Sequence, residues 1–210
     1  MLIRRFLVPF VLLVFGIAAA HPAAADSGDD AMKFIDDFGH RAIASLTSSN
    51  LSDEELTNRF RVLFEEGFDV PFIAKSALGR FWPRASDAER TQYIPLFEDY
   101  IVEIYASQFR GYVGQGFKPQ SAHVDDSGFV TVFSDVTAED GTVTKLQWIV
   151  VNISGKPRIR DILIEGVSMI QTYRDQFANE ILQHDGKVAG LLDALREKTA
   201  SLKTHTAGSG

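Results

Sequence analysis

The spacing of apolar residues divides the chain into helical and strand-rich parts. From about residue 30 to 109, apolar side chains recur every three or four positions, which is the spacing of one helix face. Three later segments alternate apolar with polar side chains and are rich in β-branched residues, which predicts strands over 129–137, 144–152 and 158–165. Helical spacing then returns from residue 168 onward.

Start and stop signals mark the helix boundaries. Ser52 with Glu55, and Ser86 with Glu89, have the spacing of a capping box, which opens a helix. Gly79 is placed to end a short helix. Besides the helix that Ser52 opens, the expected helices span about 30–47, 69–78, 86–109, 168–184 and 187–202.

The connections between the strands are short. Asp140-Gly141 is typical of a hairpin turn, and residues 120–124 predict an edge strand. Connections of this length do not allow crossovers, so the sheet is expected to be antiparallel. The order of helices, strands and helices predicts one α+β domain, with helices packed on one face of a curved antiparallel sheet.

The N-terminus has the pattern of a secretory signal peptide. Arg4 and Arg5 precede an apolar run, and Ala23 and Ala25 fit an A-x-A cleavage site. We therefore expect a cleaved signal peptide over 1–25 and a periplasmic protein, while a retained N-terminal anchor is the alternative. The remaining chain is expected to form a single domain over 26–202, followed by a disordered tail over 203–210.

Charge and composition exclude several functions. After cleavage, 19 basic residues stand against 28 acidic ones, a net charge of −9 without a basic stripe, which argues against nucleic-acid binding. The chain has no cysteine, which excludes disulfides and thiolate chemistry. Its four remaining histidines have no metal-ligand spacing, so we expect no metal and no cofactor.

The segment RIRDILIEGVSM at 158–169 resembles a catalytic site because it holds two carboxylates and a serine. Asp161 and Glu165 would lie about 13 Å apart along a strand, which is farther than a pair of hydrolytic carboxylates. Ser168 precedes Gln171 by three positions, so its hydroxyl is expected to cap a helix. We therefore assign no catalytic residue.

Apolar residues exceed what one core contact requires. Of the 20 aromatic residues after position 25, 13 lie between Phe60 and Phe117, and the helix over 86–109 has two adjoining apolar stripes. A filled core and a hollow ligand cavity both fit this pattern, because periodicity cannot distinguish them.

Three blocks resemble the MlaC, or toluene-tolerance, family of periplasmic phospholipid-binding proteins. They read FDVPFIAKSALGRFWPRAS, RIRDILIEGVSMIQTYRDQF and GKVAGLLDALREK, and the resemblance extends over about 31–198. It implies an NTF2-like fold with an apolar cavity between sheet and helices, and a carrier without catalytic activity. The implied carrier shuttles glycerophospholipid between inner- and outer-membrane complexes and so maintains lipid asymmetry.

The resemblance also implies partners. They are an inner-membrane lipid transporter complex of the ABC type, an outer-membrane lipoprotein complex and a phospholipid ligand, with the carrier a monomer. A subgroup associated with hopanoid synthesis makes a polycyclic lipid the alternative cargo, and a small periplasmic hydrolase is the alternative of a different class. The residues expected around the lipid tails are Phe97, Ile101, Ile104, Tyr105, Trp148, Val150, Ile164, Val167 and Met169.

Overall fold

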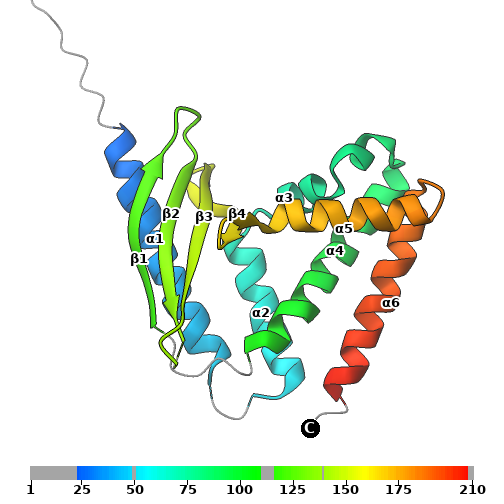
Figure 1. The fold of residues 1–210 in the computed structure, drawn as a ribbon, viewed down its shortest axis with the longest axis horizontal. Helices are drawn as coiled ribbons and strands as arrows, with labels where there is room; N and C mark the ends of the chain where they lie inside the picture. Colours follow the sequence, from blue (N-terminus) through cyan, green and yellow to red (C-terminus); the bar gives the residue numbers. More distant parts are fainter. Residues whose placement is uncertain (1–22, 49–50, 110–115, 139, 208–210) are drawn as a thin grey trace, which may run out of the picture.

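The computed structural model describes residues 23–48, 51–109, 116–138 and 140–207. Within these ranges, four α-helices come first, then a sheet, then two more α-helices, so the expected α+β class is confirmed (Figure 1). The helices are α1 (Ala23–Leu46), α2 (Asp53–Gly67), α3 (Val70–Leu78), α4 (Asp87–Gln108), α5 (Met169–Gln183) and α6 (Val188–Ala207), with a 3-10 helix η1 (Gly79–Arg84) after α3.

The sheet is an antiparallel meander with strands in chain order. Its strands are β1 (Gly116–Val124), β2 (Val130–Thr137), β3 (Val143–Ile153), β4 (Lys156–Ile164) and β5 (Val167–Ser168). Short turns connect them, as the sequence predicts, and β1 forms one edge. One irregularity shifts the β3–β4 register between Ile149 and Val150, so Arg160 of β4 has no partner residue in β3.

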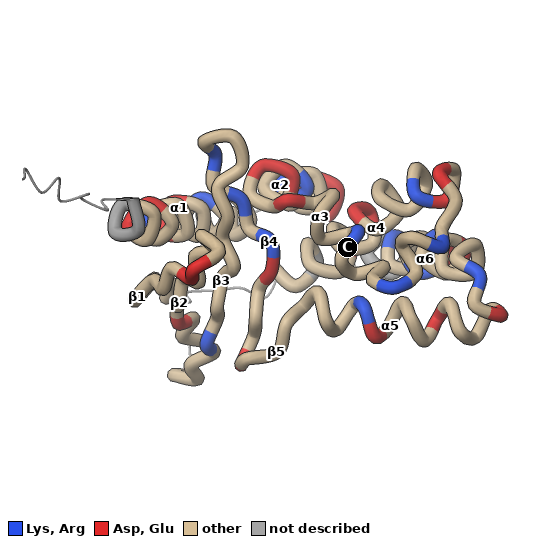
Figure 2. Tube along the Cα trace, turned by 90° about the horizontal axis from the view of Figure 1, so that it is seen from above, with Lys and Arg blue, Asp and Glu red and all other residues tan. Residues whose placement is uncertain are grey.

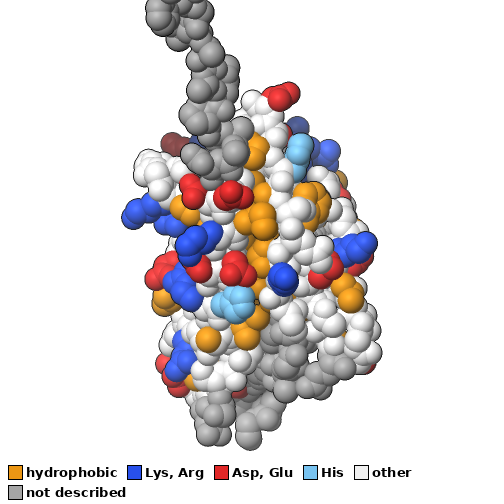
Figure 3. Space-filling view, turned by 90° about the vertical axis from the view of Figure 1, so that its left-hand side faces the viewer, with side chains coloured by type: hydrophobic (Ala, Val, Ile, Leu, Met, Phe, Trp, Pro, Cys, Tyr) orange, Lys and Arg blue, Asp and Glu red, His pale blue; other side chains and the backbone are white. Residues whose placement is uncertain are grey.

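Helix α1 packs on the sheet through the apolar face that the sequence shows. Ile35 and Phe38 are buried against Val132 and Val150, together with Trp148 of β3. Seen from the β1 side, apolar side chains form a narrow band with charged ones on both sides (Figure 3). The buried residues between α1 and the sheet form one of two cores among the described residues.

The second core lies among the helices on the other side of the molecule. Helices α3, α4, α5 and α6 enclose Phe81, Tyr93, Phe97, Phe177 and Leu191. Helix α5 leaves the sheet at β5 and runs toward α6, so the sheet and this helical group lie side by side (Figure 2). The sheet meets this helical group through β4, which contacts α3 and α5.

Most predicted boundaries are within a few residues of the observed ones, and two differ more. Helix α1 begins at Ala23, upstream of the expected start near residue 30 and of the expected cleavage site after Ala25. Helix α6 continues to Ala207, so residues 203–207 of the expected disordered tail are helical, and 208–210 lie outside the described residues. Residues 1–22 of the expected signal peptide also lie outside the described part of the chain.

The helix caps follow the sequence signals with one difference. Ser86 and Glu89 form the complete reciprocal box: the Ser86 amide donates to Glu89 Oε2 at 2.8 Å, and the Glu89 amide donates to Ser86 Oγ at 3.2 Å. At Ser52 only the serine half forms, because Glu55 turns to Arg59 instead. An arginine one turn away attracts a carboxylate more strongly than a backbone amide does.

Candidate functional site

An apolar cavity of about 480 Å³ lies between the sheet, α1, α2 and the ends of α4 and α5. Its walls carry few polar groups. On the sheet side, Leu146 and Trp148 of β3 adjoin Ile162 and Ile164 of β4, their register partners. On the helix side, Phe97 and Ile101 come from α4, and Met169, Ile170 and Tyr173 come from α5.

The sheet wall is apolar because of the strand period of two. Leu146 and Trp148 project from the same face of β3, as do Ile162 and Ile164 of β4. The Trp148 indole N–H donates to Ser134 Oγ at 2.9 Å, and Ser134 is buried. The one polar atom of this ring is therefore satisfied by a side chain of the sheet, and the ring can line a dry cavity.

Helix α4 supplies one row of apolar side chains to both the cavity and the helical core. Phe97, Ile101 and Tyr105 follow one another at intervals of four and line the cavity. Tyr93 and Phe97 also contact the ring of Phe177 in α5, with ring centroids 6.3 Å and 6.1 Å away. This single row therefore packs in the helical core near the start of α4 and lines the cavity toward the end of the helix.

The cavity brings together six of the nine residues that the sequence suggested: Phe97, Ile101, Tyr105, Trp148, Ile164 and Met169. The other three lie outside its wall. Val150 is 2% exposed and packs in the core between α1 and the sheet, Val167 is 59% exposed, and Ile104 is half-buried. Strand alternation places Val150 on the correct face, but α1 covers this end of β3.

Sequence reasoning missed the contributions of α1 and α2. Phe38, Ala42 and Leu46 of α1 and Phe60 and Phe64 of α2 line the cavity. Their apolar spacing is visible in the sequence, but it predicts only that these faces are buried. A Cβ added at Gly39 would lie 2.3 Å from the Phe117 ring, so the missing side chain lets this ring lie against α1.

Asp161, Glu165 and Ser168 have structural contacts. Asp161 accepts hydrogen bonds from Ser168 Oγ, the Ile162 amide and the Ile170 amide, at 2.5, 2.9 and 3.1 Å. Ser168 Oγ accepts the Gln171 amide at 3.1 Å, which makes it the expected cap of α5. These bonds fix the start of the helix that carries Met169 and Tyr173.

Glu165 lies in the turn after β4. Its Oε1 accepts the Lys145 amide at 2.6 Å, and its own amide donates to the Lys145 carbonyl at 3.0 Å. Its backbone is left-handed with φ of +49°, and Gly166 follows with φ of +80°. The carboxylate therefore holds the β4–β5 turn to β3 and does not face Asp161 along a strand.

Polar groups at the cavity wall are few and mostly paired. Arg160 Nε donates to Asp69 at 2.8 Å, and the Arg160 guanidinium stacks over Phe72 at 4.1 Å. The Tyr173 hydroxyl donates to the Tyr105 hydroxyl at 3.0 Å. Burial, more than any charge, raises the pKa of both tyrosines, so both hydroxyls stay neutral.

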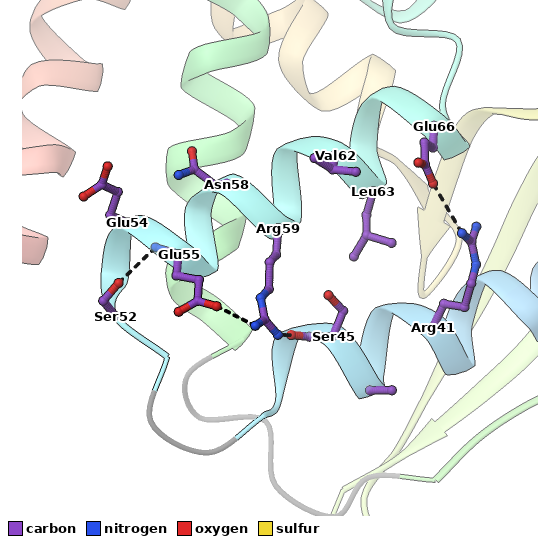
Figure 4. Close-up of a pocket in the computed structure, with 11 residues that line it drawn as sticks. Arg41, Ser45, Ser52, Glu54, Glu55, Asn58, Arg59, Val62, Leu63 and Glu66 are labelled. Atoms are coloured by element: carbon purple, nitrogen blue, oxygen red, sulfur yellow. Dashed lines mark hydrogen bonds and ion pairs between the residues drawn. The ribbon is translucent and has the colours of Figure 1, made fainter.

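A second depression, of about 880 Å³, lies on the outside between α1 and α2 (Figure 4). It is open and rimmed by charge: Arg59 pairs with Glu55, and Arg41 approaches Glu66 to 3.3 Å. Arg59 also donates to the Ser45 carbonyl at 2.9 Å. These pairs stay in water, so the groove offers little to an apolar ligand despite its size.

Two further features bear on the chemistry. Within the described ranges, no three His, Asp or Glu side chains lie close enough together to hold a metal ion. None of the described helices is long and apolar enough to cross a membrane.

This geometry defines an α+β fold with an apolar cavity, the kind of site that takes an apolar ligand. The chain belongs to the MlaC family, because the sequence profile described as MlaC protein matches residues 37–197. The family that the sequence blocks resemble is thereby confirmed. The match does not single out the hopanoid-associated subgroup, which stays a prediction.

Two known proteins are similar to this chain, one in sequence and one in fold. The chain is 25% identical over 136 residues to the toluene tolerance protein ttg2D of Pseudomonas putida, an alignment that covers 64% of this chain and 63% of that protein. The aligned part is thus less than two thirds of that relative. The fold is similar to that of a phospholipid-binding protein from Ralstonia solanacearum, solved in complex with a phospholipid. The TM-score is 0.75 at 23% identity, covering 82% of this chain and 98% of that chain, which confirms the fold class.

Proposed function

We propose that this protein is a lipid carrier that holds the acyl chains of a glycerophospholipid in the cavity between sheet and helices. The observation that carries the proposal is the apolar lining of this cavity of about 480 Å³. Membership in the MlaC family supports it, as does the similarity of the fold to a protein solved with a phospholipid.

A carrier must shield the acyl chains of its lipid from water. An acyl chain in water costs about 0.8 kcal/mol for each exposed CH2, or on the order of 10 kcal/mol for a chain of about 16 carbons. A wall of Phe97, Ile101, Trp148, Ile164 and Met169 replaces water around the chain with apolar contacts. The headgroup can remain solvated at the cavity mouth.

We assign the tails to the six expected residues that line the cavity, with Tyr105 as the sixth. Ile104, Val150 and Val167, which the sequence also suggested, lie outside the wall and are not part of this assignment. The aromatic residues of α1 and α2 are added instead, above all Phe38, Phe60 and Phe64.

The proposed setting is the periplasm, where MlaC proteins work. Export would use residues 1–25 as a signal peptide with cleavage after Ala25. The carrier would act as a monomer between an inner-membrane transporter complex and an outer-membrane lipoprotein complex. With a net charge of −9 in the mature chain, attraction to anionic membranes is weak, which favours delivery through protein partners.

The enzyme alternative has little support in the site. The carboxylates and serine of the segment 158–169 are engaged in the start of α5 and in the β4–β5 turn. A hydrolase would need a nucleophile and a base facing the cavity. We therefore propose transport without catalysis, with a polycyclic lipid as the alternative cargo.

Lipid analysis of freshly purified protein tests this function. The protein, isolated from the periplasm without detergent, is extracted with organic solvent, and the extract is analysed by mass spectrometry and phosphorus assay. We expect about one glycerophospholipid per chain. A hopanoid in the extract would establish the alternative cargo, and free fatty acids formed from added phospholipid would instead indicate a hydrolase.

A further inference from the structure

Two tyrosine hydroxyls in the wall of the apolar cavity form a pair, and one of them has an O–H that is free to donate. Tyr105 of α4 and Tyr173 of α5 both line the cavity, and their hydroxyl oxygens are 3.0 Å apart. Tyr173 is 8% exposed and Tyr105 is half-buried. A hydrogen bond between two phenols uses the O–H of one of them, so the O–H of the other can still donate to a further acceptor.

No acceptor for this remaining proton is found among the residues that the structure describes. Burial raises the pKa of both phenols, so the proton stays on the pair under physiological conditions. A donor without an acceptor in an apolar cavity costs free energy. It is therefore suited to a ligand that brings an oxygen acceptor into the cavity.

The other polar side chains of the wall fit this role less well. Asp161 is an acceptor and already receives three hydrogen bonds. Arg160 pairs with Asp69 and stacks on Phe72, and Gln108 is exposed to solvent. Thr144 lies on the sheet side of the cavity, on β3, opposite Val136 of β2. The tyrosine pair is the donor that two packed helices hold in place.

We infer that the Tyr105–Tyr173 pair binds an ester carbonyl oxygen of the cargo and so selects acyl-ester lipids. The inference rests on the proposed carrier function and specifies the substrate class of the same cavity. An acyl ester presents a carbonyl acceptor next to its hydrocarbon chain, as this site requires. An alkyl ether or a polycyclic hydrocarbon without an oxygen at that place would leave the phenol unpaired, and the carrier would hold it less tightly.

A competition experiment tests this selectivity. The protein is stripped of lipid and offered equal amounts of a diacyl phosphatidylethanolamine and its dialkyl ether analogue with chains of equal length. Native mass spectrometry then gives the ratio of the two complexes. We expect the wild type to hold the ester about threefold to tenfold more often, the ratio that one ordinary hydrogen bond produces.

Three single substitutions locate the effect. Tyr105→Phe removes the free O–H and should bring the ratio close to one while both lipids still bind. Tyr173→Phe leaves the Tyr105 O–H in place and should lower the ratio only in part. Tyr100→Phe is the matched control, because Tyr100 lies on the same helix and contacts the Tyr173 ring at 6.3 Å but does not line the cavity. This variant should keep the wild-type ratio.

Other outcomes overturn the inference. They are a wild type that takes both lipids equally, a Tyr105→Phe variant that keeps the preference, or a preference that disappears in Thr144→Val and not in the tyrosine variants. A wild type that binds neither lipid would count against the proposed carrier function itself.

Discussion

Helix α2 separates two depressions of opposite character. On one side, Phe60 and Phe64 line the apolar cavity, and on the other, Arg59 and Glu66 line the charged groove. Leu63 borders both. The groove has the larger volume, yet its ion pairs are exposed and its shape is open. The amphipathic sequence of α2 thus produces a polar surface and an apolar wall from one element.

The difference shows that volume alone does not identify a binding site. A lipid gains free energy from each apolar surface that it covers, and exposed ion pairs resist losing their water. The cavity offers aromatic and aliphatic walls from α1, α2, α4, α5 and the sheet, whereas the groove offers mostly charged and polar side chains from two helices. The lipid is therefore expected in the smaller space.

The largest effect is expected from filling the cavity. Ala42 and Ala44 lie two positions apart on α1, and Ala42 faces the cavity while Ala44 faces the groove. Ala42→Trp should remove more than 90% of the co-purified phospholipid, because the indole occupies the space of the acyl chain. Ala44→Trp is the matched control and should leave lipid content at the wild-type level. Phosphorus assay on protein of verified fold measures both.

Equal lipid loss in both variants would show that the effect does not come from the cavity. Loss in Ala44→Trp alone would place the lipid in the groove. The unfolding temperature distinguishes filling from overpacking, because a tryptophan forced into a packed core costs about 1–3 kcal/mol.

The sequence predicts the helices and strands of this molecule well and the lining of its cavity less well. Alternating apolar residues and turn residues such as Asp140-Gly141 determine strands locally, so the sequence predicts the antiparallel order of neighbouring strands. Whether Val150 faces the cavity or a neighbouring side chain depends on where α1 crosses the sheet, which is a long-range property. Alternation along β3 gives the face on which Val150 lies, but it does not show that α1 covers this residue.

A second prediction compares the caps beside the two depressions. Ser168 begins α5 at the cavity, and Ser52 begins α2 at the groove, and each accepts a backbone amide at 3.1 Å. Ser168 also donates to Asp161. Each alanine variant should lower the free energy of unfolding by about 0.5–2 kcal/mol, with the larger loss at Ser168. Chemical denaturation measures the loss. If Ser168→Ala removed a lipid-ester hydrolysis activity at unchanged stability, we would abandon the carrier function.

A third, smaller effect is expected in the groove itself. Arg59→Met removes the ion pair with Glu55 and the bond to the Ser45 carbonyl. Because the pair is exposed, the free energy of unfolding should fall by about 0.2–1 kcal/mol, and less at high salt. Lipid content should not change. A variant that folds normally but lacks lipid would indicate that the groove takes part in binding.

The smallest effect concerns the polar contact between α2 and α4. Burial, then a hydrogen bond with Glu65, raises the pKa of Glu98, although Arg61 donates to it at 2.9 Å. Between about pH 4.5 and the raised pKa, Glu98 therefore binds its proton more tightly in the folded protein than in the unfolded chain. Stability from this proton is present at low pH and is lost as pH rises through the raised pKa.

Glu98→Gln provides the comparison for this pH dependence. Relative to the variant, the wild type should lose stability as pH rises from 4.5, in a series of denaturation curves at fixed ionic strength. The opposite slope would mean that the Arg61 contact outweighs burial. Lipid content should be the same in both proteins, since Glu98 does not line the cavity.

The most direct test of the central claim is a crystal structure of the protein purified with its lipid. We predict acyl-chain density between the wall of Trp148 and Ile164 and the wall of Ile101 and Tyr105, with the groove between α1 and α2 free of lipid. Acyl density in the groove would contradict the account. So would a cavity closed by its own side chains in protein that carries a stoichiometric lipid elsewhere.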